Sequence, residues 1–143
     1  MIAATPEGIG RGSISLGPMM IINPFSNQLV LAASASGGVT GASAISSVVA
    51  RSYLNKQSLE AAIAAPRVHH SGAPDVTYFE PNLDKDVVSY LVNLGHNVAA
   101  TPRIGLVNIA YCPGGFPGYQ ETCSIRTDPR GHGLALNAAE LAN

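Results

Sequence analysis

The chain has 143 residues, of which 46% are hydrophobic and only 12% are charged, and its formal net charge is −1. This length suits one domain, or part of one, and the scattered Lys and Arg residues form no basic patch of the kind that binds nucleic acid. No apolar run approaches the ~20 residues needed to cross a membrane. Charged residues are also far fewer than the ~25% of an average domain, so we expect another layer or a partner to cover much of the surface.

Two strands are predicted near the start of the chain. Residues 1–17 are rich in glycine and serine and read as an extended loop. Two apolar runs then follow, Met19–Ile22 and residues 28–33, with turn-forming residues at 23–27 between them. Because both runs are almost continuously apolar, we expect these strands to be covered on both faces.

The second strand leads into a helix through Gly37 and Gly38. Apolar residues recur at helical spacing from Val39 to about Leu54, directly after the two glycines. The first N–H groups of a helix have no partner inside it, and they lie at the positive end of its dipole. Such groups stabilise anions or the negative oxygen of a reacting carbonyl. We therefore predict an oxyanion or carboxylate cradle at Gly37 and Gly38, with glycines that merely permit a tight turn as the alternative.

Known phosphate-binding glycine patterns do not explain this corner. The P-loop pattern fails because no lysine follows the glycines at the required spacing, and the dinucleotide-binding G-x-G-x-x-G pattern is missing as well. A catalytic nucleophile is also lacking, since the sequence has no G-x-S-x-G motif and neither cysteine has a histidine near it in the sequence.

The remaining elements predict an α+β fold. A helix over residues 58–65 begins at Ser58 and ends before Pro66, and a helix over 84–94 begins at Asp84. Strands are predicted over residues 76–80, 104–111 and about 120–127, followed by a turn at 128–130 with a local pair between Asp128 and Arg130. This order fits helices layered on a mainly antiparallel sheet.

Cys112 and Cys123 flank a segment rich in proline and glycine. If the flanking strands pair as a hairpin, the two thiols can meet. The sequence favours two free thiols in strand positions and leaves a disulfide as the alternative. A redox or metal role is disfavoured because there is no C-x-x-C motif.

Further polar residues are candidates for binding. His69 and His70 point to opposite sides of an extended chain, which favours local hydrogen bonding and packing over a shared metal ion. Ser13 and Ser15 lie in the loop before the first strand, where a hydroxyl could bind a substrate carboxylate. The residues alone favour solvated or loop-capping serines there. We predict no metal and no cofactor.

An ordered series of motifs resembles the γ-glutamyltranspeptidase (glutathione hydrolase) family. The resemblance runs over roughly residues 11–135, and its most specific parts are the Gly-Gly turn and the block A-P-R-x-H-H. Two of the motifs are worded more like those of animal members. The matching segments are residues 12–18, 34–38, 59–70, 76–82, 106–110 and 127–130.

The resemblance implies a fold and a chemistry. Members of this family are N-terminal nucleophile hydrolases with a four-layer αββα sandwich. A threonine freed by self-cleavage attacks the γ-glutamyl amide of glutathione, and the γ-glutamyl group passes to water or to an acceptor amino acid or peptide. By resemblance, Gly37 and Gly38 form the oxyanion hole. The serine pair that holds the substrate α-carboxylate falls on Ile14 and Ser15, of which only Ser15 has a hydroxyl.

Other parts of the family's site lie outside the matching region. These are the nucleophilic threonine segment, the residues that hold the substrate α-amino group, and the large subunit with its arginine. We therefore expect residues 18–135 to be the C-terminal portion of a small subunit, followed by a tail over 136–143. Its partners would be glutathione and other γ-glutamyl compounds, a large subunit and the N-terminal part of the small subunit.

Two functional readings follow from this partial match. In the first, the chain contributes to an enzyme on the outer face of the plasma membrane, a placement that rests on resemblance alone, and is inactive by itself. In the second, it is a non-catalytic remnant that acts as a protein-interaction domain.

Overall fold

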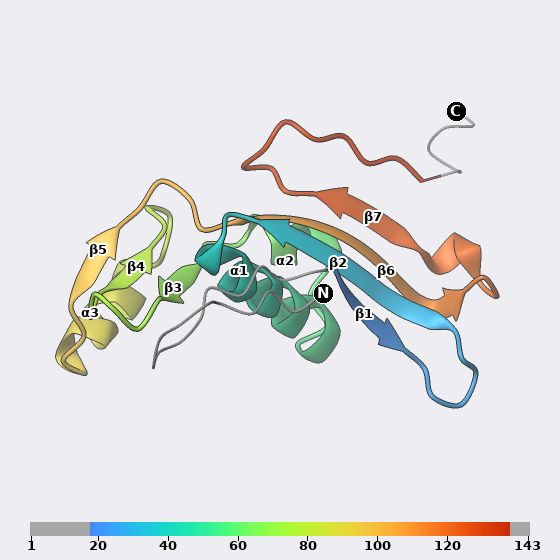
Figure 1. Ribbon diagram of the computed structural model, residues 1–143, viewed down its shortest axis with the longest axis horizontal. Coiled ribbons are helices and arrows are strands. Elements are labelled where there is room, and N and C mark those ends of the chain that lie inside the picture. Colours follow the sequence, from blue (N-terminus) through green and yellow to red (C-terminus); the bar gives the residue numbers. More distant parts are fainter. Residues whose placement is uncertain (1–17, 138–143) are drawn as a thin grey trace, which may run out of the picture.

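The computed structural model describes residues 18–137 and contains two β-sheets (Figure 1). The larger sheet has the strand order β1-β2-β6-β7 and is antiparallel throughout. The smaller sheet has the order β3-β4-β5, with β3 and β4 antiparallel and β4 and β5 parallel. The smaller sheet and α3 lie together at one end of the elongated molecule.

Consecutive strands and consecutive helices both occur along the chain. In order they are β1 (Met19–Ile22), β2 (Leu29–Ser36), α1 (Val39–Val49), the π-helix η1 (Ala50–Leu54), α2 (Leu59–Ala64), β3 (Val68–His70), β4 (Thr77–Phe79), α3 (Lys85–Asn93), β5 (Val98–Ala100), β6 (Leu106–Phe116), the 3-10 helix η2 (Gln120–Thr122) and β7 (Ser124–Thr127). Within residues 18–137, no helix has both the length and the apolar character needed to cross a membrane.

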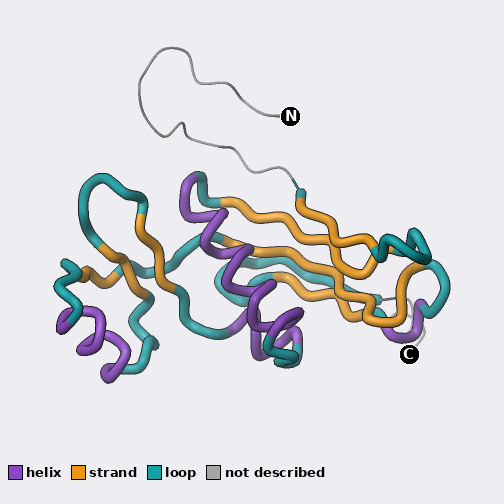
Figure 2. Tube along the Cα trace, turned by 90° about the horizontal axis from the view of Figure 1, so that it is seen from below, coloured by secondary structure: helices purple, strands orange, loops and turns teal. Residues whose placement is uncertain are grey.

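The core lies between the larger sheet and the two helices α1 and α2, which cover one face of that sheet (Figure 2). Alternate residues of β2 and β6 point into this layer, as the two-residue period of a strand requires. Buried positions in α1 recur every three or four residues. The buried core residues are Leu31, Ala33, Ala44, Ile45, Val48, Leu59, Ala62, Ile63, Val107 and Ile109. The predicted α+β class, with helices on a mainly antiparallel sheet, is confirmed.

Apolar side chains are exposed on strands at the edge and end of the larger sheet. Met20 and Ile22 of β1 are 63% and 48% exposed, and Phe116 of β6 is 45% exposed. The expectation that both of the first two strands are covered on both faces is therefore wrong for β1, whereas in β2 only Ser36 is exposed. The reason is that α1 and α2 supply a single helical layer, so the continuous apolar runs have a cover on one side only.

The helix boundaries follow the predicted capping chemistry. The Ser58 hydroxyl accepts a hydrogen bond from the Ala61 N–H at 3.2 Å, and the Asp84 carboxylate accepts one from the Asp86 N–H at 2.8 Å. The helix predicted from Val39 to Leu54 is present as α1 and η1, the latter a π-helical continuation.

Several strand predictions need correction. The three-residue strands β3 and β5 were not predicted, because a segment this short shows no measurable periodicity. β6 runs to Phe116, through glycine and proline residues that were expected to form a loop. There the positive φ of Gly115 and a shift in the β2–β6 register accommodate the irregular backbone. Residues 120–122 form η2 rather than the start of a strand.

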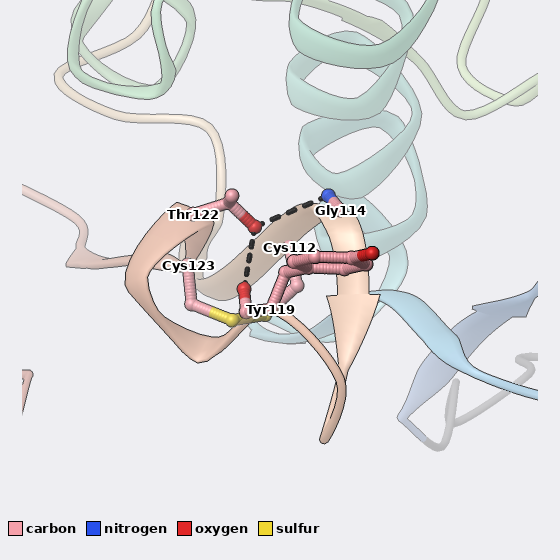
Figure 3. Close-up of a disulfide and its surroundings, with 5 residues drawn as sticks. All are labelled: Cys112, Gly114, Tyr119, Thr122 and Cys123. Carbon is pink, nitrogen blue, oxygen red and sulfur yellow. Dashed lines mark hydrogen bonds between the residues drawn. A yellow bond between two sulfur atoms is a disulfide. The ribbon is translucent and has the colours of Figure 1, made fainter.

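Cys112 and Cys123 form a disulfide (Figure 3), so the favoured expectation of two free thiols is wrong. The β6–β7 register explains the bond: Tyr111 pairs with Ser124, which brings the next residue of β6 opposite Cys123. The Thr122 hydroxyl accepts a hydrogen bond from the Gly114 N–H at 3.1 Å and donates one to the Tyr119 carbonyl at 2.7 Å. The turn after β6 is thus held by both the disulfide and a side-chain hydroxyl.

Candidate functional site

Gly37 and Gly38 form the corner between β2 and α1. Their φ angles are +114° and +59°, which other residues adopt only with strain. Their carbonyls accept hydrogen bonds from the first turn of α1: Thr40 N–H to Gly37 at 3.2 Å and Gly41 N–H to Gly38 at 3.1 Å. Neither glycine N–H donates to another described residue. The corner therefore offers two backbone donors at the start of a helix, where an anion is stabilised.

The two glycines differ in their surroundings. A Cβ at Gly37 would lie 2.7 Å from the Thr40 hydroxyl oxygen and 3.0 Å from the Gly105 Cα, so this residue is packed against the backbone before β6. A Cβ at Gly38 would meet nothing within 4 Å. Among the described residues, space for a reacting group therefore lies beside Gly38, while Gly37 is packed against its neighbours. This arrangement fits the predicted cradle, and its catalytic role stays a prediction.

A buried arginine holds the backbone against which Gly37 packs. Arg67 is 0% exposed, and its Nη1 donates to the Ile104 carbonyl at 3.0 Å and to the Gly105 carbonyl at 3.3 Å. Its Nη2 forms an ion pair with Asp128 Oδ2 at 2.7 Å. Asp128 in turn accepts the Val107 N–H at 2.9 Å. The position of the glycine corner thus depends on an ion pair between the segment before β3 and the segment after β7.

A second arginine extends this network. Arg130 Nη2 lies 2.5 Å from Glu80 Oε2, and its Nη1 lies 3.1 Å from Asp128 Oδ1. Glu80 also accepts the N–H groups of Ile104 and Arg67, at 2.8 Å and 3.0 Å. The predicted local pair of Asp128 and Arg130 is confirmed. Sequence reasoning assigned no role to Arg67 or Glu80, although both lie in motif segments, residues 59–70 and 76–82, that carry the family resemblance.

The network favours the charged forms of Asp128 and Arg130, whereas burial lowers the pKa of Arg67. Burial alone would raise the pKa of Asp128, but hydrogen bonds from the Arg130 and Val107 backbone and from Arg67 outweigh it and hold that pKa below its ordinary value. Burial likewise opposes the charge of Arg130, yet Glu80 and Asp128 raise its pKa. Asp128 is therefore ionised at neutral pH.

A pocket of about 250 Å³ opens beside the glycine corner. It is lined by Val39, Thr40, His69, Ser71, Tyr78, Thr101, Arg103 and Ile104. His69 is 6% exposed, and its Nδ1 lies 2.8 Å from the Ser43 hydroxyl oxygen of α1. Burial lowers the pKa of His69, so its ring is neutral at pH 7.

The remaining predicted site residues have different outcomes. Local hydrogen bonding of the two histidines is confirmed, since His70 Nε2 lies 3.1 Å from Asp75 Oδ1. Among residues 18–137, no group of three or more His, Cys, Asp or Glu side chains could hold a metal ion. The serine candidates Ser13 and Ser15, together with Ile14 and the loop predicted over 1–17, lie outside the described residues, so their roles stay predictions.

Comparisons with known proteins point to one family. The family model described as gamma-glutamyltranspeptidase matches residues 6–138. A glutathione hydrolase from Aspergillus flavus is 28% identical over 88 residues, which cover 62% of this chain and 15% of that protein. This relative is fungal, and the animal-like wording of two motifs stays a prediction.

Solved structures agree with that match. A gamma-glutamyltranspeptidase from Pseudomonas nitroreducens, complexed with L-DON, is 25% identical with a TM-score of 0.73, over 94% of this chain and 66% of that one. A mutant of the Helicobacter pylori gamma-glutamyltranspeptidase is 24% identical with a TM-score of 0.71, over 87% of this chain and 66% of that one, and shows the shared fold. This chain thus spans under two thirds of the length of these relatives.

Proposed function

Because this chain belongs to the gamma-glutamyltranspeptidase family, we propose that it supplies the oxyanion hole of an enzyme that cleaves the γ-glutamyl bond of glutathione and related compounds. The observation that carries the proposal is the corner at Gly37 and Gly38, where two backbone N–H groups at the start of α1 donate to no other described residue. The family provides the reaction in which such a pair is needed.

The proposed chemistry assigns this chain an electrostatic task. Attack of a threonine hydroxyl on the γ-carbonyl carbon produces a tetrahedral intermediate, whose oxygen becomes negative. The N–H groups of Gly37 and Gly38 donate to that oxygen, and loss of one such donor typically lowers kcat by ~10²–10³-fold. Collapse of the intermediate, with the threonine hydroxyl proton passed to the leaving nitrogen, breaks the C–N bond, expels the peptide amine and leaves a γ-glutamyl-enzyme, which water or an acceptor amino acid or peptide then attacks.

Substrate binding requires residues beyond those of the described structure. We propose that Ser15 donates a hydrogen bond to the α-carboxylate of the γ-glutamyl group, with Ile14 contributing none. The threonine, the groups for the α-amino end and the arginine for the carboxylate would come from a large subunit and from the N-terminal part of the small subunit. The isolated 143-residue polypeptide would then be inactive. The outer face of the plasma membrane is the proposed location.

The surface of the chain supports such partners. Met20, Ile22 and Phe116 expose apolar area on the larger sheet, and only 12% of the residues carry charge. Exposed apolar area of this kind is usually covered in the assembled protein. The same face supports the second reading, a non-catalytic remnant that binds a protein partner through this sheet.

The two readings are separated by an activity measurement. The intact protein that carries this chain should release the anilide from a γ-glutamyl anilide and should transfer the γ-glutamyl group to glycylglycine, while the 143-residue polypeptide alone releases none. An intact protein that binds a partner but never turns over the anilide would refute the enzymatic reading.

A further inference from the structure

The pocket beside the glycine corner contains a cation without a counter-charge. Arg103 lies exposed on the rim, and its guanidinium forms no ion pair or hydrogen bond with another described residue. Among the described residues that line this pocket, none is acidic. By contrast, the guanidinium groups of Arg67 and Arg130 each contact a carboxylate within 2.7 Å. Arg103 is thus left to pair with something outside the described structure.

Neutral hydrogen-bonding groups accompany this cation. His69 and Tyr78 are cross-strand partners in β3 and β4, so their side chains emerge on the same side of the smaller sheet. The His69 ring is fixed through Nδ1 to the Ser43 hydroxyl at 2.8 Å, and its Nε2 makes no hydrogen bond with another described residue. The hydroxyls of Tyr78 and Thr101 also lack described partners. One positive charge with several neutral polar groups suits a monoanion with two oxygen atoms.

The location of the pocket relates it to the reacting bond. Val39 and Thr40 line the pocket and directly follow Gly38 in the chain. The peptide released from glutathione has two residues and ends in a carboxylate, as does an acceptor such as glycylglycine. Two extended residues span about 7 Å. A peptide whose amine lies at the glycine corner therefore has the length to place its carboxylate in the neighbouring pocket.

We propose that this pocket binds the terminal carboxylate of the leaving or acceptor peptide, with Arg103 pairing its charge and Tyr78 and His69 orienting it. This assignment rests on the proposed function. It adds a site for the peptide half of the substrate, distinct from the Ser15 position proposed for the γ-glutamyl carboxylate. Arg103 acts in specificity and affinity, and it takes no part in the bond-breaking step.

Binding of a plain dipeptide tests the pocket without any turnover. In the intact protein with 13C-labelled histidine, glycylglycine should shift the ring signal of His69 in a saturable way. Arg103→Gln should weaken this binding about tenfold. This factor corresponds to the lower end of the free-energy range for a charge-assisted hydrogen bond, because the side chain is exposed to solvent. Lys85→Gln, which removes an equal charge from α3 outside the pocket, should leave the affinity for glycylglycine unchanged.

Glycylglycinamide, which lacks the carboxylate, should also bind about tenfold more weakly. Equal affinities for the two dipeptides, or for the two variants, would overturn the proposal.

Kinetics separate this inference from the proposed function. Arg103→Gln should raise the KM for glycylglycine in transfer about tenfold, whereas Lys85→Gln, outside the pocket, should leave that KM unchanged. Dipeptide binding that depends on Arg103, in a protein without γ-glutamyl turnover, would support the carboxylate pocket and refute the enzymatic function. Turnover without such binding would support the function and refute the pocket.

Discussion

Two arginine-containing regions of this molecule border the Ile104–Gly105 backbone and differ in how their charges are paired. Around Arg67, two cations and two carboxylates are held in one network, with distances of 2.5 to 3.1 Å. Around Arg103, a single cation borders an open pocket with no described counter-ion. The difference teaches how to read charge in a structure: a buried, fully paired network maintains the fold, whereas an unpaired charge at a pocket is available to a ligand.

The network also connects the fold to the corner. Arg67 donates to the carbonyl of Gly105, and Gly105 lies 3.0 Å from the position that a Cβ on Gly37 would occupy. Loss of the network should therefore displace the Gly105 backbone and, with it, the glycine corner that packs against it. Loss of Arg103 should have no such effect, because that side chain is exposed and makes no ion pair or hydrogen bond with another described residue.

The largest effect is expected from Asp128→Asn. This change leaves the fully buried Arg67 without its counter-charge, and breaking one side of a buried pair costs about 3–5 kcal/mol of unfolding free energy. The matched control is Asp75→Asn, which disrupts the exposed contact with His70 and should cost under about 1 kcal/mol. Urea unfolding of both variants measures the difference, and similar midpoints would show that the network does not stabilise the fold.

A smaller loss is expected when the disulfide is removed. Replacing Cys112 and Cys123 together by serine frees a loop with a sequence separation of 11 residues, and the entropic model assigns about 2–3 kcal/mol to a loop of this size. Because Cys112 lies in the second half of β6, whereas the pocket residues Thr101, Arg103 and Ile104 precede that strand, dipeptide binding should be unaffected once the protein is folded. Altered affinity in a folded double variant would show that the two ends of β6 are coupled.

The pH dependence of stability should separate the two regions. Burial lowers the pKa of His69 below 6.5, so the unfolded chain binds this proton more readily and stability falls as the pH drops below about 6.5. Because the pKa of Asp128 is lowered in the folded state, the ionised carboxylate stabilises the fold above pH 3.8, the ordinary pKa of aspartate. That contribution is lost only as the pH falls through the lower pKa of Asp128 in the folded protein. His69→Asn should flatten the first decline, whereas His70→Asn should retain it. Thermal unfolding from pH 7 to pH 3 records both declines, and an unchanged profile in His69→Asn would contradict the assignment.

The smallest effect on stability is expected from Arg103→Gln. The side chain is exposed and unpaired, so its loss should change the unfolding free energy by less than about 0.5 kcal/mol. A folded, equally stable variant with impaired dipeptide binding would sharpen the contrast with Arg67. If the unfolding free energy fell by 2 kcal/mol or more, well beyond the ~0.5 kcal/mol expected of a surface change, Arg103 would stabilise the fold as Arg67 does.

Local chemistry accounts for the parts of this fold that the sequence predicts well. Ser58 and Asp84 cap their helices because hydroxyl and carboxylate oxygens accept orphan N–H groups, and this requires no distant residue. Gly37 and Gly38 likewise mark a strand-to-helix corner through their backbone freedom. The family follows from the order and spacing of several motifs, each of which is weak alone.

Long-range contacts account for most of what the sequence did not predict. Arg67 and Asp128 are far apart in the chain, and neither carries a local sign of its partner. The disulfide depends on the β6–β7 register, which strand patterns alone do not specify. The pocket beside the corner is formed by α1, β3, β4 and the segment before β6, so its unpaired Arg103 becomes visible only in three dimensions.

The central claim is that the corner at Gly38 stabilises a negative oxygen during γ-glutamyl transfer. The most direct measurement is kcat for a γ-glutamyl anilide in the intact protein carrying Gly38→Ala, compared with Gly95→Ala. Both glycines have a positive φ, +59° and +89°, and a Cβ added at either would meet no described atom within 4 Å, but Gly95 follows α3 and lies outside the glycine corner and its pocket. We predict that Gly38→Ala lowers kcat at least tenfold, part of the ~10²–10³-fold that loss of a whole donor costs, while Gly95→Ala leaves kcat unchanged. Equal kcat values in the two variants would contradict the account.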